Sequence, residues 1–210
     1  MSTAGAAEVW IEPDTVLEGP RLRLEPAHQR HAGPLWDIAK DTGVWTWIPA
    51  PILSKAQLLE RIAAAQTLRE RGITFAFVIL DKASGEYAGS TSFLNIERQH
   101  RRLEIGFTWL GLSWQRTHVN TEAKFLLLRH AFESLACIRV EFKTDAKNAV
   151  SRAALKRIGA REEGCLRQHM VCHDGRLRDS IYFSILDSEW PEVKEDLIEK
   201  MNRHSRGGAQ

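Results

Sequence analysis

The sequence predicts one domain of the α/β (α+β) class, in which helices cover both faces of a mixed central sheet. Three observations support this prediction. First, the predicted elements run strand, two helices, three strands, helix, strand, helix and two strands. Second, the chain has 210 residues, of which 43% are hydrophobic and 27% charged, which is enough for one sizeable core and too few to require two. Third, no internal repeat or low-complexity block is visible.

Charge balance and cysteine content narrow the class of protein. The net charge of +2 and the pI near 8.5 are too mild for a nucleic-acid-binding surface, whereas they suit an anionic small cofactor. No apolar run could span a bilayer, and residues 1–7 lack the features of a signal peptide, so we expect a cytoplasmic protein with no membrane partner. Cys137, Cys165 and Cys172 form no CxxC pair, which argues against a disulfide framework.

The domain is expected to occupy residues 16–203. Residues 1–15 are small, polar and aperiodic, and residues 204–210 are polar, so both segments are expected to be flexible tails. Leucines alternate with charged residues over 17–26, as in a half-buried strand. A helix is expected over residues 27–39.

An aromatic loop follows this helix. Ser54 is a typical helix start and Gly72 a typical helix end, so a second helix is predicted over residues 54–71. Trp45 and Trp47 lie in the loop before it. They either line a substrate pocket or form a hydrophobic plug over the first pair of helices, and exposed tryptophans are also compatible with a homodimer.

The remaining elements follow in the middle and at the end of the chain. Residues 73–80 and 86–96 are strand-like segments joined by a turn, which is typical of an antiparallel hairpin. The basic cluster at 98–102 is either a solvated turn or a site for an acidic group. The later elements are predicted as strands over 103–110 and 138–144, a helix ending at 136, a helix over 148–158, strands over 161–172 and 178–186, and a helix opened by Pro191.

The strand at 103–110, the loop after it and the following apolar helix are the segments around which the other elements are arranged. Asn120 or Thr121 is the natural helix cap, which places several unpaired backbone N–H groups at the loop. Together with the helix dipole, these groups form a seat for phosphate. Side chains that could add donors are Gln115, Arg116 and His118. A nucleotide-tailed cofactor is therefore one hypothesis, and an ordinary strand-to-helix turn is the other.

Three motifs in this arrangement resemble the GNAT acetyltransferase superfamily, and specifically its ribosomal-protein N-acetyltransferase branch. They are Glu-Ile-Gly-Phe at 104–107, Thr-Glu-Ala at 121–123, and the segment 148–159 followed by Glu163-Gly164. The resemblance covers about residues 16–187. It implies splayed central strands, with the pantetheine arm of acetyl-CoA inserted between strands 103–110 and 138–144. It also implies acetyl-CoA as cosubstrate, an amine acceptor and no metal.

The resemblance also implies which residues bind the cofactor. Backbone groups of Phe107, Thr108, Trp109 and Leu110 would bind pantetheine, and Asn148, Ser151 and Arg152 would lie beside it. The pyrophosphate loop would comprise Gln115, Arg116, Thr117, His118, Val119, Asn120 and Thr121.

This loop departs from the family pattern. His118 stands where the family has glycine, and Asn120 where it has glycine or alanine. Glycine lets backbone N–H groups approach phosphate, and a histidine is harder to accommodate than an asparagine if the backbone is left-handed. Either side chains of Arg116, Thr117 and Asn120 bind phosphate in a remodelled loop, or cofactor binding is weak or lost. We expect the remodelled loop.

Acetyl transfer to an amine requires a neutral amine, a donor for the oxyanion and a proton for the departing thiolate. A backbone N–H near Trp109 or Leu110 could be the oxyanion donor. Glu104 and His169 are the candidate bases, because the position of the family's glutamate falls on Met170, which cannot accept a proton. Ser151 matches the serine proposed as general acid in the ribosomal-protein branch. The alternatives are a salt-bridged strand carboxylate, a surface histidine and a serine that bonds the helix start.

The leading hypothesis is an enzyme that transfers an acetyl group, in a ternary complex, to a primary amine of a protein N-terminus or a small molecule. A non-catalytic acyl-CoA-binding module is the alternative. A metal protein built on Cys165, His169, Cys172 and His173 is a third, disfavoured because the spacing matches no standard zinc pattern. Acceptor specificity is expected in the loops at 42–53, 97–102 and 172–177.

Overall fold

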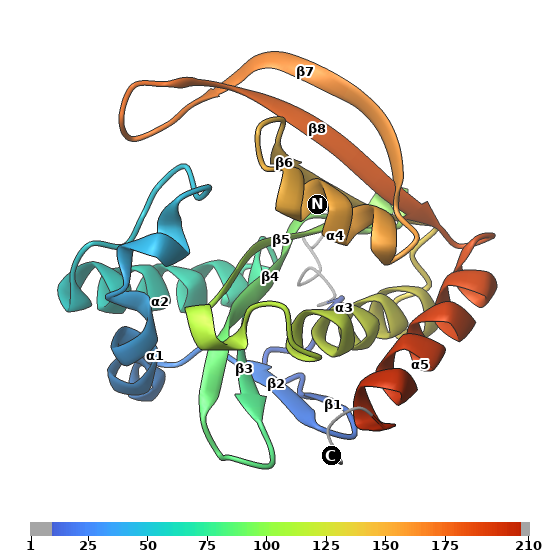
Figure 1. Ribbon diagram of the computed structural model, residues 1–210, viewed down its shortest axis with the longest axis horizontal. Helices are drawn as coiled ribbons and strands as arrows, with labels where there is room; N and C mark the ends of the chain where they lie inside the picture. Colours follow the sequence, from blue (N-terminus) through green and yellow to red (C-terminus); the bar gives the residue numbers. More distant parts are fainter. Residues whose placement is uncertain (1–9, 207–210) are drawn as a thin grey trace, which may run out of the picture.

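The computed structural model describes residues 10–206, so the parts of the expected tails at 1–9 and 207–210 lie outside the described residues. One eight-stranded sheet runs through the molecule in the order β1-β2-β3-β4-β5-β6-β8-β7. Helices α1 and α2 cover one face of the sheet, and α3 and α5 cover the other (Figure 1). The predicted mixed sheet with helices on both faces is therefore confirmed.

The first five strands form an antiparallel meander. Their bounds are Leu17–Glu18 for β1, Leu22–Pro26 for β2, Phe75–Asp81 for β3, Tyr87–Glu97 for β4 and Arg102–Leu110 for β5. The strand predicted over 17–26 is interrupted, because the chain turns at Gly19, whose N–H donates to the carbonyl of Leu22 at 2.9 Å. The predicted hairpin of 73–80 and 86–96 is confirmed as β3 and β4.

Helices follow the predicted order. Their bounds are Ala32–Ala39 for α1, Lys55–Glu70 for α2, Val119–Arg129 for α3, Ala149–Arg157 for α4 and Trp190–Arg206 for α5, with one π-helical turn, His130–Ser134, after α3. Short 3₁₀ turns occupy Gln29–His31, Thr42–Trp45, Arg98–His100 and Leu112–Trp114. α2 begins as predicted, because Ser54 Oγ accepts from the backbone N–H of Gln57 at 3.2 Å. α1 begins later than predicted, because residues 29–31 form a 3₁₀ turn.

Apolar side chains pack on both faces of the sheet. The larger cluster lies under α3 and α5 and the smaller under α1 and α2. Ile11 is only 6% exposed and belongs to the larger cluster, against which Trp10 packs, so these two residues of the expected N-terminal tail are attached to the fold. α5 likewise extends to Arg206, within the expected C-terminal tail. Among residues 10–206, no helix combines the length and apolarity needed to cross a bilayer.

The two central strands separate part of the way along the sheet. β6 (Arg139–Asp145) runs parallel to β5, but the two pair only from Arg102↔Arg139 to Glu104↔Glu141. Beyond that point β6 continues beside β8 (Leu177–Leu186), which in turn pairs with β7 (Arg161–Val171). Residues 105–110 of β5 therefore present an open edge toward β6, as the family resemblance implied.

Candidate functional site

A bulge in β5 shapes its open edge. The register with β4 shifts between Ser90↔Trp109 and Ser92↔Gly106, and Phe107 takes the left-handed backbone conformation with φ of +46°. Such a conformation costs a non-glycine residue about 1–3 kcal/mol. Leu103 and Ile105 belong to the larger apolar cluster, and the bulge then reverses the alternation, so that Trp109 joins the smaller cluster and Leu110 the larger one.

The segment after β5 leads into α3 through a loop held by its own side chains. Gln115 Nε2 donates to the carbonyl of Leu110 at 3.2 Å. Thr117 Oγ1 donates to the carbonyl of Trp114 at 2.7 Å and accepts from the backbone N–H of Val119 at 3.3 Å. α3 has His118 at its N-cap position, without a side-chain cap bond, so the predicted cap at Asn120 or Thr121 is wrong. The helix begins earlier because this turn already directs the chain.

The helix start still offers backbone donors. The first backbone hydrogen bond of the helix runs from the N–H of Glu122 to the carbonyl of His118 at 3.0 Å. The N–H groups of Asn120 and Thr121 come before it and therefore have no acceptor within the helix. Arg116 is exposed at the turn and left-handed, with φ of +61°. These groups can bind an anion at the positive end of the helix dipole.

His118 and Asn120 do not require glycine-like backbone. His118 has φ of −63° and ψ of −22°, and Asn120 lies within the helix, so the left-handed position of the loop is Arg116 instead. The His118 side chain turns inward, with Nε2 3.5 Å from Asp81 Oδ1, and burial lowers the pKa of its imidazole. The expected side-chain donor at His118 is thus directed away from the loop.

The Thr-Glu-Ala motif anchors α3 to the sheet. The carboxylate of Glu122 is fully buried and accepts from the backbone N–H groups of Arg21 at 2.8 Å and Leu22 at 2.9 Å, and from Arg21 Nε at 3.0 Å. Thr121 is also fully buried, and its Oγ1 has no hydrogen-bond partner among the described residues. The motif therefore fixes where the helix start lies relative to β2.

The residues carried over from the third motif lie at the start of α4. Asn148 Oδ1 accepts from the backbone N–H of Ser151 at 2.9 Å and so caps the helix. Arg152 lies beside them, with Nη2 3.4 Å from Glu162 Oε2 on β7. Since Asn148 provides the cap, the hydroxyl of half-buried Ser151 does not have that role.

The two candidate bases lie apart. Glu104 is 2% exposed, accepts from Asn95 Nδ2 at 2.8 Å and lies 3.5 Å from Lys143 Nζ. His169 is exposed on β7, where its Nδ1 lies 3.1 Å from Ser180 Oγ. Glu104 is therefore a carboxylate with two donors near the point where β5 leaves β6, whereas His169 belongs to the outer strand of the sheet.

Lys124 was not among the predicted site residues. It is only 6% exposed in α3, and its Nζ donates to Thr108 Oγ1 at 2.8 Å. Burial lowers the pKa of this amine from 10.5 to about 7, while the charge of Glu104 raises it. A charged residue at the head of an apolar helical run was the only sequence signal for it.

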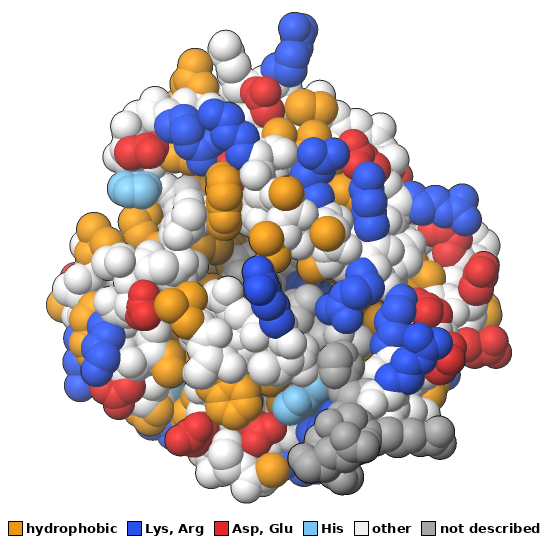
Figure 2. All heavy atoms as spheres, viewed as in Figure 1, with side chains coloured by type: hydrophobic (Ala, Val, Ile, Leu, Met, Phe, Trp, Pro, Cys, Tyr) orange, Lys and Arg blue, Asp and Glu red, His pale blue; other side chains and the backbone are white. Residues whose placement is uncertain are grey.

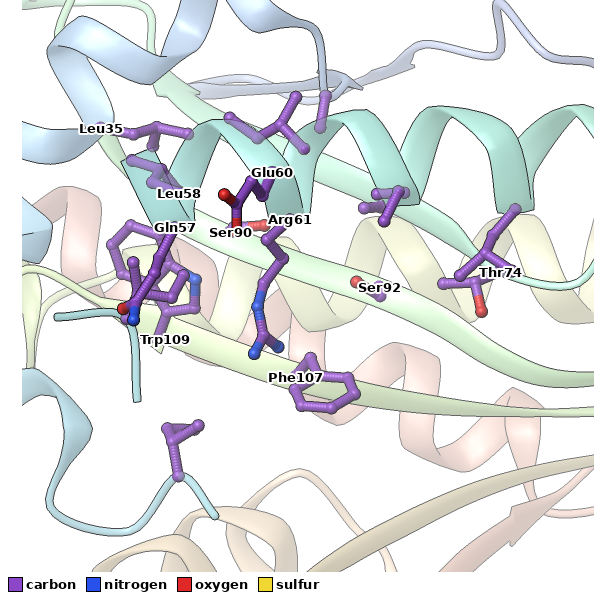
Figure 3. Close-up of a pocket in the computed structure, with 18 of the residues that line it drawn as sticks. Leu35, Gln57, Leu58, Glu60, Arg61, Thr74, Ser90, Ser92, Phe107 and Trp109 are labelled. Atoms are coloured by element: carbon purple, nitrogen blue, oxygen red, sulfur yellow. The ribbon is translucent and has the colours of Figure 1, made fainter. Parts of the chain in front are cut away.

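A cavity of about 580 Å³ lies on the opposite side of the sheet from α3. α2, the segment before it and strands β3, β4 and β5 form its walls (Figure 3). Trp45 and Trp109, with ring centres 5.2 Å apart, line it, whereas the exposed Trp47 does not. Arg61 extends from α2 toward the bulge, with its guanidinium 5.7 Å from the centre of the Phe107 ring (Figure 3). The open edge of β5 thus borders a mostly apolar pocket, and the guanidinium of Arg61 is one of the groups that line it.

Two of the three loops expected to set specificity meet beside this pocket. The β7–β8 hairpin arches over the sheet toward the segment between α1 and α2 (Figure 1), and the N–H of His173 donates to the carbonyl of Pro49 at 3.0 Å. The third loop lies elsewhere, because Arg101 Nε donates to the carbonyl of Ala136 behind α3 at 2.8 Å. In the space-filling view, Lys and Arg side chains stand beside a hollow on this face (Figure 2).

The three cysteines are free thiols, and burial raises the pKa of Cys137 to about 12. Within residues 10–206, no group of three or more His, Cys, Asp or Glu side chains is placed to hold a metal ion.

Comparison with known proteins places this arrangement in context. The sequence matches the family described as Acetyltransferase (GNAT) domain over residues 21–161. The Bacillus subtilis (strain 168) protein YdaF, provisionally named a ribosomal N-acetyltransferase, is 34% identical over 110 residues, which is 52% of this chain and 59% of that protein. This chain thus matches less than two thirds of that relative. The ribosomal-protein-serine acetyltransferase of Escherichia coli (strain K12) is 26% identical over 181 residues, 84% of this chain and 99% of that protein.

Two solved structures have a similar fold. A GCN5-related N-acetyltransferase from Brucella melitensis is 33% identical, with a TM-score of 0.83 over 90% of this chain and 86% of that chain. RimJ from Mycobacterium smegmatis, in complex with CoA-disulfide, is 26% identical, with a TM-score of 0.78 over 90% of this chain and 95% of that chain.

Proposed function

This chain belongs to the GNAT acetyltransferase family, and on that basis we propose that it transfers an acetyl group from acetyl-CoA to a primary amine by direct attack in a ternary complex. The observation that carries this proposal is the open edge of β5. Residues 105–110 have left β6 and border the cavity. A strand edge with unpaired amide groups is suited to an extended chain that itself contains amides, such as pantetheine.

The residues around this edge fit acetyl-CoA. The N–H groups of Asn120 and Thr121, with the exposed guanidinium of Arg116, would hold the pyrophosphate. Two buried polar atoms, Thr121 Oγ1 and Arg152 Nε, lack a hydrogen-bond partner among the described residues and could bind the cofactor. Backbone groups at 107–110 and the amide of Asn148 would hold the pantetheine arm.

The bound cofactor would supply the activated acyl group. Glu104 is suited to the base, since one of its oxygens lies next to Gly106, directly before the bulge, and the carboxylate is buried beside the open edge. Its proton route from the amine would pass through water, because Asn95 and Lys143 already engage the carboxylate. His169 is the alternative base. A backbone N–H at Trp109 or Leu110 would stabilise the oxyanion.

Ser151 would donate the proton to the departing CoA thiolate. It lies in the first turn of α4, three residues after Asn148, and its hydroxyl is not needed as the cap. The acceptor would enter the apolar cavity between α2 and strands β3–β5. Relatives named for ribosomal-protein acetylation favour a protein N-terminus, while the cavity also suits a small-molecule amine.

Calorimetry with acetyl-CoA, followed by a thiol-release assay over a panel of amines and N-terminal peptides of ribosomal proteins, tests this proposal. We expect binding and release of CoA that depends on the amine. Binding without turnover on any amine would instead support a non-catalytic acyl-CoA-binding module. Absence of binding would contradict both.

A further inference from the structure

Lys124 occupies a position where a lysine is costly. Its side chain is almost fully buried in α3, and an ammonium group loses its hydration there. Its Nζ donates to Thr108 Oγ1 at 2.8 Å and lies 5.7 Å from the centre of the Phe142 ring. Thr108 belongs to β5 and Phe142 to β6, and both lie beyond the last paired residues of these strands. The amine therefore contacts both strands from the face of the sheet that α3 covers, at the point where the strands have separated.

The Thr108 hydroxyl that accepts this bond is part of a row of side-chain hydrogen bonds that links α3, β5 and β4. Thr108 Oγ1 lies 2.8 Å from Thr91 Oγ1 on β4. Because an ammonium group can only donate, Thr108 Oγ1 accepts a hydrogen bond from Lys124, and its own O–H can donate a hydrogen bond to Thr91 Oγ1. Thr108 directly follows Phe107, the left-handed residue of the bulge. A bulge interrupts the ladder of backbone bonds, so side-chain bonds of this kind are needed to hold it in one geometry.

We propose that Lys124 is a positioning residue for the cofactor: by holding Thr108, it keeps the bulge of β5 in the geometry that presents residues 107–110 to the pantetheine arm. This inference rests on the proposed function. It also explains why the lysine lies on α3, because the same helix begins with the N–H groups assigned to the pyrophosphate. One rigid element then sets the distance between the two halves of the cofactor site.

The charged form of Lys124 makes the stronger bond to Thr108. Burial lowers the pKa of this amine to about 7, against the effect of Glu104, so the fraction in the charged form falls as the pH rises above neutrality. The charged groups on the elements packed around it are Glu104 on β5, Lys143 on β6, the Arg21–Glu122 pair between β2 and α3, and the Lys194–Glu133 pair between α5 and the end of α3. Cofactor affinity should therefore decrease from acidic to alkaline pH.

The test measures CoA binding by calorimetry for the wild type, Lys124→Met, Thr108→Val and the double variant. At about pH 6 each single variant should bind CoA roughly tenfold more weakly, and the double variant no more weakly than either single one, because both remove the same bond. Lys194→Met, which removes a partly exposed lysine of α5, is the matched control and should bind as the wild type does. Melting temperatures are recorded in parallel, since a merely structural role would change them without the shared loss of affinity.

The pH dependence of CoA affinity provides a second readout, which does not depend on whether a substitution changes the stability of the fold. Between about pH 6 and pH 8.5 the wild type should lose several-fold more affinity than Lys124→Met, and the comparison cancels the titration of CoA itself. Equal affinities and equal pH profiles would overturn the inference, as would additive losses in the double variant. If the wild type itself binds no CoA, the proposed function fails, which is a different result from binding that ignores Lys124.

Discussion

Replacing Lys124 by Met should change how stability depends on pH. Methionine is long, flexible and apolar, so it can fill the same space without a charge. The pKa of Lys124 is about 7 in the folded protein and 10.5 as its model value, so between these pH values the unfolded state binds more protons. Linkage then requires that the wild-type free energy of unfolding rises with pH in this window. Below pH 7 the wild type bears the full cost of the buried charge.

The magnitude follows from the same values. Each pH unit well inside the window corresponds to about 1.4 kcal/mol and the slope is smaller near pH 7, so from pH 7 to pH 9 the wild type gains about 2 kcal/mol relative to Lys124→Met. In a chain of this size that is roughly 4–8 °C in melting temperature. Other titrating groups are common to both proteins and cancel in the difference.

Thermal and urea unfolding of both proteins at several pH values from about 6 to 9 measures this difference. Lys124→Met should exceed the wild type most below pH 7, and its advantage should shrink as the pH rises. Lys194→Met serves as control, because the partly exposed Lys194 keeps contact with solvent and its replacement should change stability by an amount that stays nearly constant with pH. A difference between Lys124→Met and wild type that does not vary with pH would refute the argument that Lys124 is buried and charged near neutrality.

Four further substitutions address the site. Gly89→Ala should cost about 2–3 kcal/mol of stability, since an added Cβ would lie 2.1 Å from the Trp109 carbonyl oxygen; unaltered unfolding would contradict this close approach. Arg116→Ala should weaken acetyl-CoA binding about tenfold by calorimetry, and unchanged affinity would exclude its side chain from the pyrophosphate site. Ser151→Ala should lower kcat on the order of 10²-fold with nearly unchanged affinity and melting temperature, whereas wild-type kcat with a lower melting temperature would indicate a structural role. Glu104→Gln should lower kcat/KM on the order of 10²-fold, and full activity would shift the role of base to His169 or a water chain.

Much of the fold follows from local sequence. Ser54 and Gly72 delimit α2 through capping and a left-handed turn, with φ of +68° at the glycine, and neither effect needs a distant partner. The order of strands and helices follows from periodicity in the same way. The motifs at 104–107 and 121–123 also placed the strand and helix that border the open edge.

Tertiary structure decided the details of the site. Alternation of side chains along β5 could not predict the bulge, because the left-handed Phe107 arises from the register between β4 and β5. The N-cap position of α3 is His118 rather than Asn120 or Thr121, because the turn after β5 fixes where the chain enters the helix. The bulge depends on the pairing with β4, which is distant from it in sequence, so the local pattern of β5 contains no record of it.

Lys124 shows the distinction most directly. A lysine at the head of an apolar helical run has the same local pattern whether its amine reaches solvent or is buried. The packing of β5 and β6 over α3 removes the route to solvent and leaves Thr108 Oγ1 as its acceptor. The sequence determined that a lysine stands on this helix. Only its enclosure by the separating strands determined that the amine is buried, that its pKa is lowered and that it bonds to the residue next to the bulge.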